Sequence, residues 1–216
     1  MTILELELLS DNLTQTETFY RRAFGLEPYF KDGNDLMFFK IGVTELIFKK
    51  SDNQKPVYHF AVDMPNNRFE DAYNYFKQKV DILTVEGSDI ADFINWDARS
   101  FYFLDNNGNI VEVITRYTTR AVDSAAFSSQ SYISVSEIGL VTPHVPQLSQ
   151  TLATEFGITN YARQPAAKHF SVSGDDNGLF ILAQSGRKWY PTQIKAQHFA
   201  TRVLYMDNGN LGHLVL

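Results

Sequence analysis

Apolar and polar positions alternate along some short segments, while other segments place apolar residues every three or four positions. The first period is typical of half-buried strands and the second of amphipathic helices. Over the first fifty residues the pattern predicts a strand at 4–9, a helix at 12–24, and strands at 36–41 and 44–49. Asn12 or Thr14 can cap this helix, Thr14 and Glu17 have the spacing of a capping box, and Gly25 suits the left-handed position after a last helical turn.

The same order of elements returns twice further along the chain. After residue 56 we expect a strand at 57–62, a helix carrying Phe69, Ala72, Tyr73, Phe76 and Val80, and strands at 82–85, 93–96, 100–104 and 110–114. The segment 105–109, Asp-Asn-Asn-Gly-Asn, has strong turn chemistry. From about residue 133 we expect a helix at 147–156, strands at 170–172 and 178–184, and a closing hairpin around Asn208-Gly209.

The units repeat at a fixed spacing. Glu5 precedes Gly25 by 20 residues, and Glu137 precedes Gly157 by the same 20 residues. Self-similarity of this kind indicates copies of one structural unit. We therefore expect two complete units in 1–117, a polar linker in 118–131, and a third unit with a terminal hairpin in 132–216.

Composition narrows the class of protein. The chain has 216 residues, a net charge of −6 and no cysteine, which leaves histidine and carboxylates as metal ligands. No basic tract is present that could neutralise nucleic-acid phosphates, and no apolar run is long enough to span a bilayer. The expectation is a cytoplasmic protein that binds neither nucleic acid nor membrane.

Three motifs, in this order, resemble the vicinal-oxygen-chelate superfamily of glyoxalases, bleomycin-resistance proteins and extradiol dioxygenases. They are Asp11-Asn12-Leu13 with Phe24-Gly25-Leu26, the strand His59-Phe60-Ala61-Val62-Asp63, and the segment from Phe103 to Glu112. The resemblance implies an α+β fold of repeated βαβββ units that form cup-shaped, open mixed sheets, with a metal ion in the cup.

The resemblance also implies a set of metal ligands. In this family the ligands lie on the first and last strands of each unit, and the positions that match here are Glu5, Glu45, His59 and Glu112. Carboxylates that share one cavity repel each other, and a divalent cation relieves that repulsion. Because most of these ligands are oxygen atoms, the expected ion is Mn²⁺, Fe²⁺, Ni²⁺ or Mg²⁺.

The implied function is that of a glyoxalase-like metalloenzyme, a divalent-metal-dependent lyase or isomerase, acting on a small substrate with vicinal oxygens. Glu5 or Glu45 is the expected general base. Two alternatives stay open: a ring-cleaving, extradiol-type dioxygenase, and a metal-free, bleomycin-resistance-like ligand-binding protein. The expected partner is a small-molecule substrate or ligand, and a homodimer also stays open.

A second metal site at Glu137, His198 and His213 is not expected. If Asn208-Gly209 is a two-residue turn, His213 pairs with Leu204. His198 then lies six residues further along, on the order of 20 Å away at about 3.3 Å per residue. We expect the third unit to pack against one rim of the cup or to serve in dimerisation.

Overall fold

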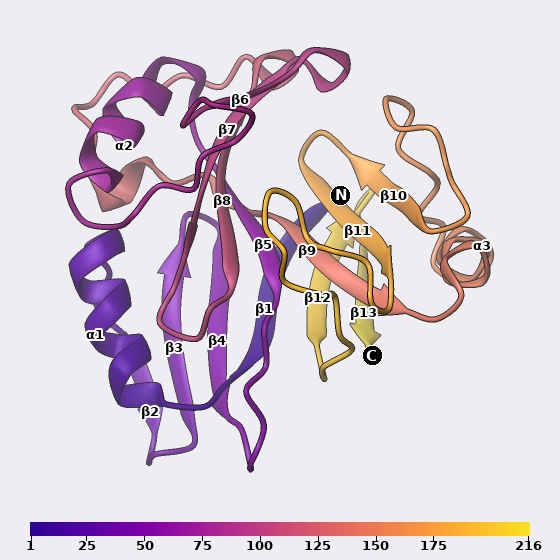
Figure 1. Ribbon diagram of the computed structural model, residues 1–216, viewed down its shortest axis with the longest axis horizontal. Helices are drawn as coiled ribbons and strands as arrows, with labels where there is room; N and C mark the ends of the chain where they lie inside the picture. Colours follow the sequence, from indigo (N-terminus) through magenta and orange to yellow (C-terminus); the bar gives the residue numbers. More distant parts are fainter.

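The computed structural model describes residues 1–216 as two mixed β-sheets with three α-helices (Figure 1). Sheet A has the strand order β13 (Asn210–Val215), β12 (Arg202–Asp207), β1 (Thr2–Ser10), β4 (Thr44–Lys50), β3 (Leu36–Ile41), β2 (Phe30–Asp32). Sheet B has the order β10 (Phe170–Asp175), β11 (Gly178–Gln184), β9 (Ser134–Thr142), β5 (His59–Asp63), β8 (Ile110–Arg116), β7 (Ala98–Leu104), β6 (Ala91–Phe93). The helices are α1 (Leu13–Phe24), α2 (Phe69–Phe76) and α3 (Val145–Glu155).

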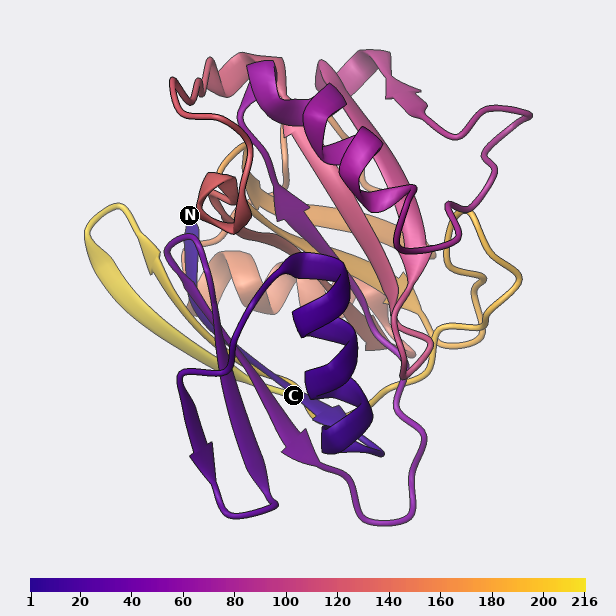
Figure 2. The same ribbon diagram turned by 90° about the vertical axis from the view of Figure 1, so that its left-hand side faces the viewer.

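Both sheets contribute one face to a shared hydrophobic core. Leu6 and Leu8 of β1, Phe103 of β7 and Phe24 of α1 belong to the same buried cluster. Figure 2 shows α1 and α2 in front of the strands on which they pack. The opposite face of each sheet, here called its outer face, carries the alternate residues of each strand, including Glu5 in sheet A and His59 in sheet B. The α+β fold of curled mixed sheets predicted from the sequence is confirmed.

The first unit forms as its pattern predicts. Asn12 caps α1 by accepting a 3.0 Å hydrogen bond from the backbone N–H of Gln15, whereas the predicted capping box of Thr14 and Glu17 does not form because Thr14 lies within the helix. Gly25 has φ of +67°, and the N–H of Leu26 bonds back to the carbonyl of Tyr20.

No helix in the structure combines the length and the apolar character needed to cross a membrane.

Two strand predictions in the second unit are wrong. Residues 82–85 form only isolated bridges, Ile82 with Phe103 and Val85 with Ser88, before the chain reverses. Residues 94–96 form a 3₁₀ turn that ends at Asp97, which has a positive φ of 51°. Only Ala91–Phe93 pairs as a strand in this region. The backbone therefore leaves the sheet here, although its residues are apolar.

The units do not pair as the sequence suggested. The sequence predicted that both units of 1–117 share one cup, whereas unit one lies in sheet A and unit two lies in sheet B. Strand β5 of unit two pairs antiparallel with β9 of unit three, and β1 pairs antiparallel with β12 of the terminal hairpin. The first strand of unit one and the first strand of unit two each have an open edge that needs a partner. The C-terminal part of the chain supplies both partners.

The terminal hairpin has the predicted register. β12 and β13 are joined at Asn208-Gly209, and Leu204 pairs with His213. His198 precedes β12 and lies outside the sheet. His213 lies within β13, opposite Leu204.

Gly42 allows a close approach between the first and third units. Its φ is +54°, and a Cβ atom built on it would lie 1.9 Å from the carbonyl oxygen of Ile133. Ile133 immediately precedes β9, and its carbonyl accepts a 2.9 Å hydrogen bond from the N–H of Val43. This turn therefore connects sheet A to the strand that completes sheet B.

We predict that Gly42→Ala lowers the free energy of unfolding by more than about 3 kcal/mol, because it combines a backbone clash with an unfavourable φ. Gly33→Ala is the matched control, since Gly33 has the same φ of +54° with no atom within 4 Å of a built Cβ. The control should lose only about 1 kcal/mol, the cost of the left-handed backbone alone. Urea unfolding of both variants measures the difference, and equal losses would contradict the close approach.

Asp105 organises the turn between β7 and β8. Its carboxylate accepts bonds from the N–H groups of Asn107 and Asn109, at 2.8 and 3.0 Å, and from the hydroxyl of Tyr20 in α1 at 3.0 Å. Burial raises the pKa of Asp105 to about 6, although these hydrogen bonds oppose the rise. A carboxyl whose pKa is raised on folding favours the folded state at low pH, and this contribution is lost as the pH rises through the folded pKa.

Asp105→Asn removes this titration while keeping an acceptor oxygen in the turn. The stability advantage of the wild type over the variant should shrink by about 2 kcal/mol between about pH 4.5 and about pH 8. Urea unfolding at the two pH values measures it. A difference that does not change with pH would show that the Asp105 pKa is close to its ordinary value.

Candidate metal centre

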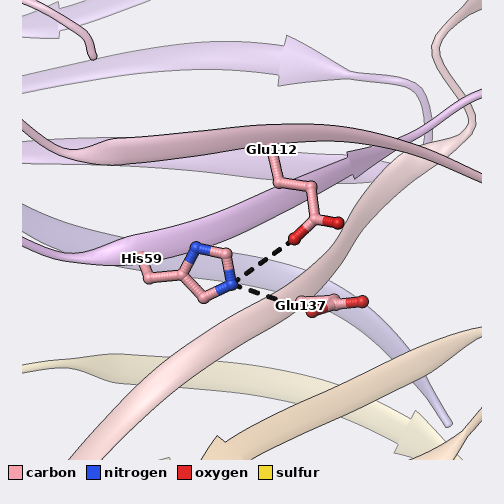
Figure 3. A group of neighbouring side chains, drawn as sticks. All are labelled: His59, Glu112 and Glu137. Carbon is pink, nitrogen blue, oxygen red and sulfur yellow. Dashed lines mark ion pairs between the residues drawn. The ribbon is translucent and has the colours of Figure 1, made fainter. Parts of the chain in front are cut away.

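Three titratable side chains from three adjacent strands meet on the outer face of sheet B (Figure 3). His59 comes from β5, Glu112 from β8 and Glu137 from β9, and all three are buried. One potential ligand atom from each residue lies within 4.8 Å of the other two. Ala61 of β5 pairs with Glu112 on one side and with Glu137 on the other. His59 lies two residues before Ala61 on the same strand, so its side chain is on the same face of the sheet.

The imidazole of His59 is oriented by the backbone. Its Nδ1 lies 3.2 Å from the carbonyl oxygen of Ile110, which fixes the proton on Nδ1 when the ring is neutral. The lone pair of Nε2 then faces the two carboxylates. An N–H to carbonyl bond on the far nitrogen is the usual support of a metal-ligating histidine.

The spacing of the ligand atoms fits a shared ion better than direct hydrogen bonds. His59 Nε2 lies 3.6 Å from an oxygen of Glu112 and 3.9 Å from an oxygen of Glu137. Both distances are too long for hydrogen bonds. Ligand bonds of about 2.0–2.2 Å place two ligands of one ion about 3.0–3.5 Å apart, so a small inward movement would suffice. One imidazole nitrogen and two carboxylates are also a suitable donor set for a divalent ion.

The pKa shifts of Glu112 and His59 indicate that the site lacks positive charge. Burial, followed by the charge of Glu137, raises the pKa of Glu112 to about 7, and His59 opposes the rise. Burial alone would lower the pKa of His59, but Glu137 and Glu112 outweigh it and raise the value. Both shifts show that the buried carboxylates attract a proton when no other cation is near.

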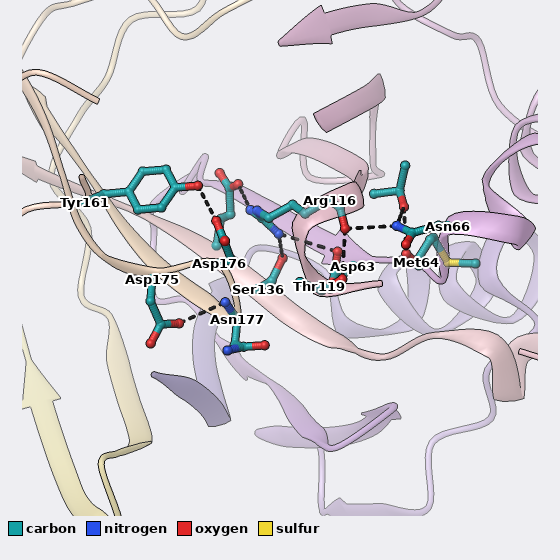
Figure 4. A network of polar contacts seen from close by, with 12 residues as sticks. Asp63, Met64, Asn66, Arg116, Thr119, Ser136, Tyr161, Asp175, Asp176 and Asn177 are labelled. Carbon is teal, nitrogen blue, oxygen red and sulfur yellow. Dashed lines mark hydrogen bonds and ion pairs between the residues drawn. The ribbon is translucent and has the colours of Figure 1, made fainter. Parts of the chain in front are cut away.

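Arg116 supports one side of the centre (Figure 4). Its guanidinium is fully buried, pairs with one oxygen of Glu137, and lies 3.5 Å from Asp63. A further N–H donates to the hydroxyl of Ser136 at 3.0 Å. Burial raises the pKa of Asp63 to about 6, although Arg116 opposes the rise. Arg116 holds one carboxylate oxygen of Glu137, and the other oxygen faces His59.

The three residues line a cavity of about 230 Å³. Its walls are mainly aromatic and apolar, and the lining residues besides the three are Phe93, Trp96, Tyr102, Gln164, Phe170, Ile181, Arg187, Trp189 and Tyr190. The segment after β11 supplies Arg187, Trp189 and Tyr190. An apolar pocket with a few convergent polar groups is the usual form of a small-molecule site.

Trp189 packs over His59 because Gly139 of β9 leaves space for the indole ring. The two ring centroids are 5.4 Å apart, and a Cβ built on Gly139 would lie 2.5 Å from Cη2 of Trp189. Trp189 is only 3% exposed, and its indole N–H has no hydrogen-bond partner. A buried donor without a partner is costly, so a polar group of a bound molecule would be favoured here.

The four residues predicted from the sequence are not brought together. His59 and Glu112 are neighbours, whereas Glu5 and Glu45 lie in sheet A. Glu5 forms a 2.8 Å ion pair with Arg202, and Glu45 lies 3.9 Å from Lys40. Glu5 and Glu45, predicted as ligands or as general base, therefore do not share the cluster of His59 and Glu112, because the strands that carry them belong to the other sheet.

Strand register explains the error at Glu45. Glu112 pairs with Ala61, two residues after His59. The corresponding pair in unit one is Glu7 with Ile47, two residues after Glu5, so Ile47 and not Glu45 matches Glu112. In unit three the same position is Ile181, which pairs with Gly139. Of the three units, only unit two has a carboxylate at the position of Glu112.

Sequence reasoning missed Glu137 as a partner of His59. The signal was present, because Glu137 stands 20 residues before Gly157 as Glu5 stands before Gly25. Which unit pairs with which was not evident from the chain. Arg116 and the covering Trp189 carried no recognisable motif.

Comparison with known proteins identifies the fold. No protein-family model matches the sequence, and no curated protein matches it. A structure from Bacillus subtilis, of a protein for which a dioxygenase activity is suggested, aligns with a TM-score of 0.61 and 13% identity over 85% of this chain. This chain spans 63% of the length of that protein.

Two further structures bear glyoxalase names. A V278E mutant of glyoxalase I from Zea mays aligns with a TM-score of 0.57 and 13% identity, over 90% of this chain and 70% of that one. A lactoylglutathione lyase from Agrobacterium tumefaciens is 26% identical over 53% of this chain and 92% of its own length, with a TM-score of 0.44. The alignments with TM-scores of 0.61 and 0.57 show that this chain shares the fold of those two proteins, in agreement with the resemblance to the vicinal-oxygen-chelate superfamily.

We predict that Gly139→Ala displaces Trp189 from its position over His59, because the new methyl group would occupy the space of the indole ring. In a Trp96→Phe background Trp189 is the only tryptophan, so its fluorescence emission should shift to longer wavelength as water reaches it. The Trp96→Phe parent is the control. An unchanged spectrum would mean that β9 or the loop moves without exposing the indole.

Proposed function

We propose that this protein, which has the vicinal-oxygen-chelate fold, is a divalent-metal-dependent enzyme of the glyoxalase type acting on a small substrate with vicinal oxygens. His59, Glu112 and Glu137 are the proposed metal ligands. The observation that carries the proposal is their convergence: three ligand atoms from three strands lie within 4.8 Å of one another, and the three residues line a largely apolar cavity.

Charge balance supports a divalent ion. Asp63, Glu112 and Glu137 bring three negative charges to the buried cluster, and Arg116 supplies one positive charge. A divalent cation bound with neutral His59 makes the cluster neutral. Uncompensated charge in a buried site is strongly unfavourable, so the apo protein depends on bound protons instead.

Three protein ligands leave room for a substrate. Ile181 stands at the position in unit three that corresponds to Glu112, and its side chain offers no donor atom. Catalytic metal sites usually keep such open positions, whereas structural sites are closed by protein ligands. The bound metal would supply Lewis-acid polarisation of the substrate oxygens.

The residues around the centre have separate tasks in this proposal. Arg116 holds Glu137 in place, and the Ile110 carbonyl orients His59. Trp189 covers the imidazole and limits the access of water. These are positioning and shielding functions, and none requires Glu5 or Glu45.

A ring-cleaving dioxygenase is the second candidate. The centre has three protein ligands and the apolar Ile181 where a fourth could stand. This arrangement favours a dioxygenase, since oxygen-activating iron sites use three protein ligands with open positions. Those sites typically have two histidines and one carboxylate, whereas this centre has one histidine and two carboxylates. The harder donor set favours Lewis-acid chemistry over oxygen activation.

Metal binding is tested with Glu112→Gln, because this change removes a buried charge without leaving an arginine unpaired. The wild type, stripped with EDTA and reloaded with Mn²⁺, should hold about one ion per chain and gain about 3 kcal/mol of stability at 100 times the dissociation constant. Glu112→Gln should fold at least as stably without metal and show no such gain. Elemental analysis and thermal unfolding give the two readouts.

Glu45→Gln is the matched control, since it makes the same chemical change in sheet A. It should bind Mn²⁺ as the wild type does. Equal metal content in wild type and Glu112→Gln would contradict the proposed ligand set, and a wild type that binds no divalent ion would favour the metal-free ligand-binding alternative.

A further inference from the structure

Arg187 is the only arginine or lysine that lines the cavity. It lies in the segment that follows β11, is half-buried, and has its guanidinium carbon 4.4 Å from the centroid of the Phe170 ring. No acidic side chain forms an ion pair with it, in contrast to the paired Arg116 and Arg202. Burial lowers the pKa of Arg187, and no neighbouring carboxylate opposes that effect.

A guanidinium in this environment is suited to an anion brought by a ligand. The aromatic ring supports its face, while the N–H groups at its edge keep the fork geometry that matches a carboxylate. Its partial desolvation strengthens any charge-assisted hydrogen bond that it forms. The protein itself provides no acceptor for these donors.

Strand register separates Phe170, on whose ring Arg187 lies, from Glu137. Phe170 pairs with Ala183 of β11, whereas Glu137 pairs with Leu179. Four residues along one strand correspond to about 13 Å between backbone positions. The same cavity is lined by residues at both places, so one molecule can reach both.

We propose that the substrate carries a carboxylate, which Arg187 binds at one end of the cavity while the vicinal oxygens lie at the end formed by His59, Glu112 and Glu137. This inference rests on the proposed function and adds a substrate class to it. A carboxylate is favoured over a phosphate or phosphonate because it has one negative charge, and Arg187 supplies one positive charge.

The rest of the cavity indicates what joins the two ends. Phe93, Trp96, Tyr102 and Tyr190 also line it, and the ring centroids of Phe93 and Tyr102 lie 6.1 and 5.8 Å from that of Tyr190. Aromatic walls favour a substrate in which the part that joins the carboxylate to the vicinal oxygens is flat or apolar.

The carboxylate preference can be tested without metal. EDTA-treated protein is titrated with phenylacetate and with its neutral amide, phenylacetamide, by isothermal calorimetry. The wild type should bind phenylacetate about 10- to 100-fold more tightly, the range of a charge-assisted hydrogen-bonded pair. Arg187→Gln should remove this preference, and Arg187→Lys should keep only part of it, because lysine lacks the planar fork.

Lys188→Gln is the matched control. Lys188 is the next residue in the same segment, is exposed, and does not line the cavity, so its loss changes the net charge equally. It should retain the wild-type preference. Equal binding of acid and amide by the wild type, or an equal loss in both variants, would overturn the assignment, as would a tenfold preference for phenylphosphonate over phenylacetate.

The metal-loaded protein separates this inference from the proposed function. With Mn²⁺ bound, 3,4-dihydroxyphenylacetate should bind more tightly than 4-methylcatechol, which has vicinal oxygens but no carboxylate. Arg187→Gln should lose that difference while keeping its metal and its affinity for 4-methylcatechol. If Mn²⁺ does not bind but phenylacetate is still preferred, the proposed function fails and the carboxylate site stands.

Discussion

The antiparallel pairing of β5 with β9 is the constraint on which the candidate site depends. It sets Ala61 opposite Glu137, while Ala61 also pairs with Glu112 on the other side. Because side chains alternate along a strand, a shift of one residue would turn Glu137 toward the hydrophobic core. The register therefore determines whether the imidazole has one carboxylate neighbour or two.

Sheet A shows what the same architecture does without such a site. Arg202 pairs with Glu7 just as Glu137 pairs with Ala61, so an arginine occupies the position that corresponds to Glu137. It forms ion pairs with Glu5 at 2.8 Å and Glu7 at 3.1 Å. A permanent cation thus pairs with both of these carboxylates in sheet A, whereas Glu112 in sheet B pairs only with the titratable His59.

The buried charges of sheet B are unfavourable for folding. Carboxylates removed from water need partners, and a pair buried in an apolar environment seldom stabilises a protein as well as apolar residues would. Arg116 compensates Glu137 and Asp63, but the only basic side chain paired with Glu112 is His59, which carries a charge only when it is protonated. Such an arrangement at a cavity is typical of sites that bind a ligand or ion, where function and stability compete.

The sequence by itself determined the local elements and the kind of unit. The Asn12 cap, the Gly25 terminus and the turn at 105–109 are local features that formed as predicted, and apolar periodicity failed only at the strands expected at 82–85 and 93–96. His59 and Glu112 were also identified, because both belong to one unit whose first and last strands are neighbours. The tertiary structure alone decided which units pair, since any open strand edge can accept any other strand of suitable pattern. It therefore replaced Glu5 and Glu45 with Glu137, and it brought Arg116, Trp189 and Arg187 to the site through contacts between residues far apart in the chain, which no local pattern encodes.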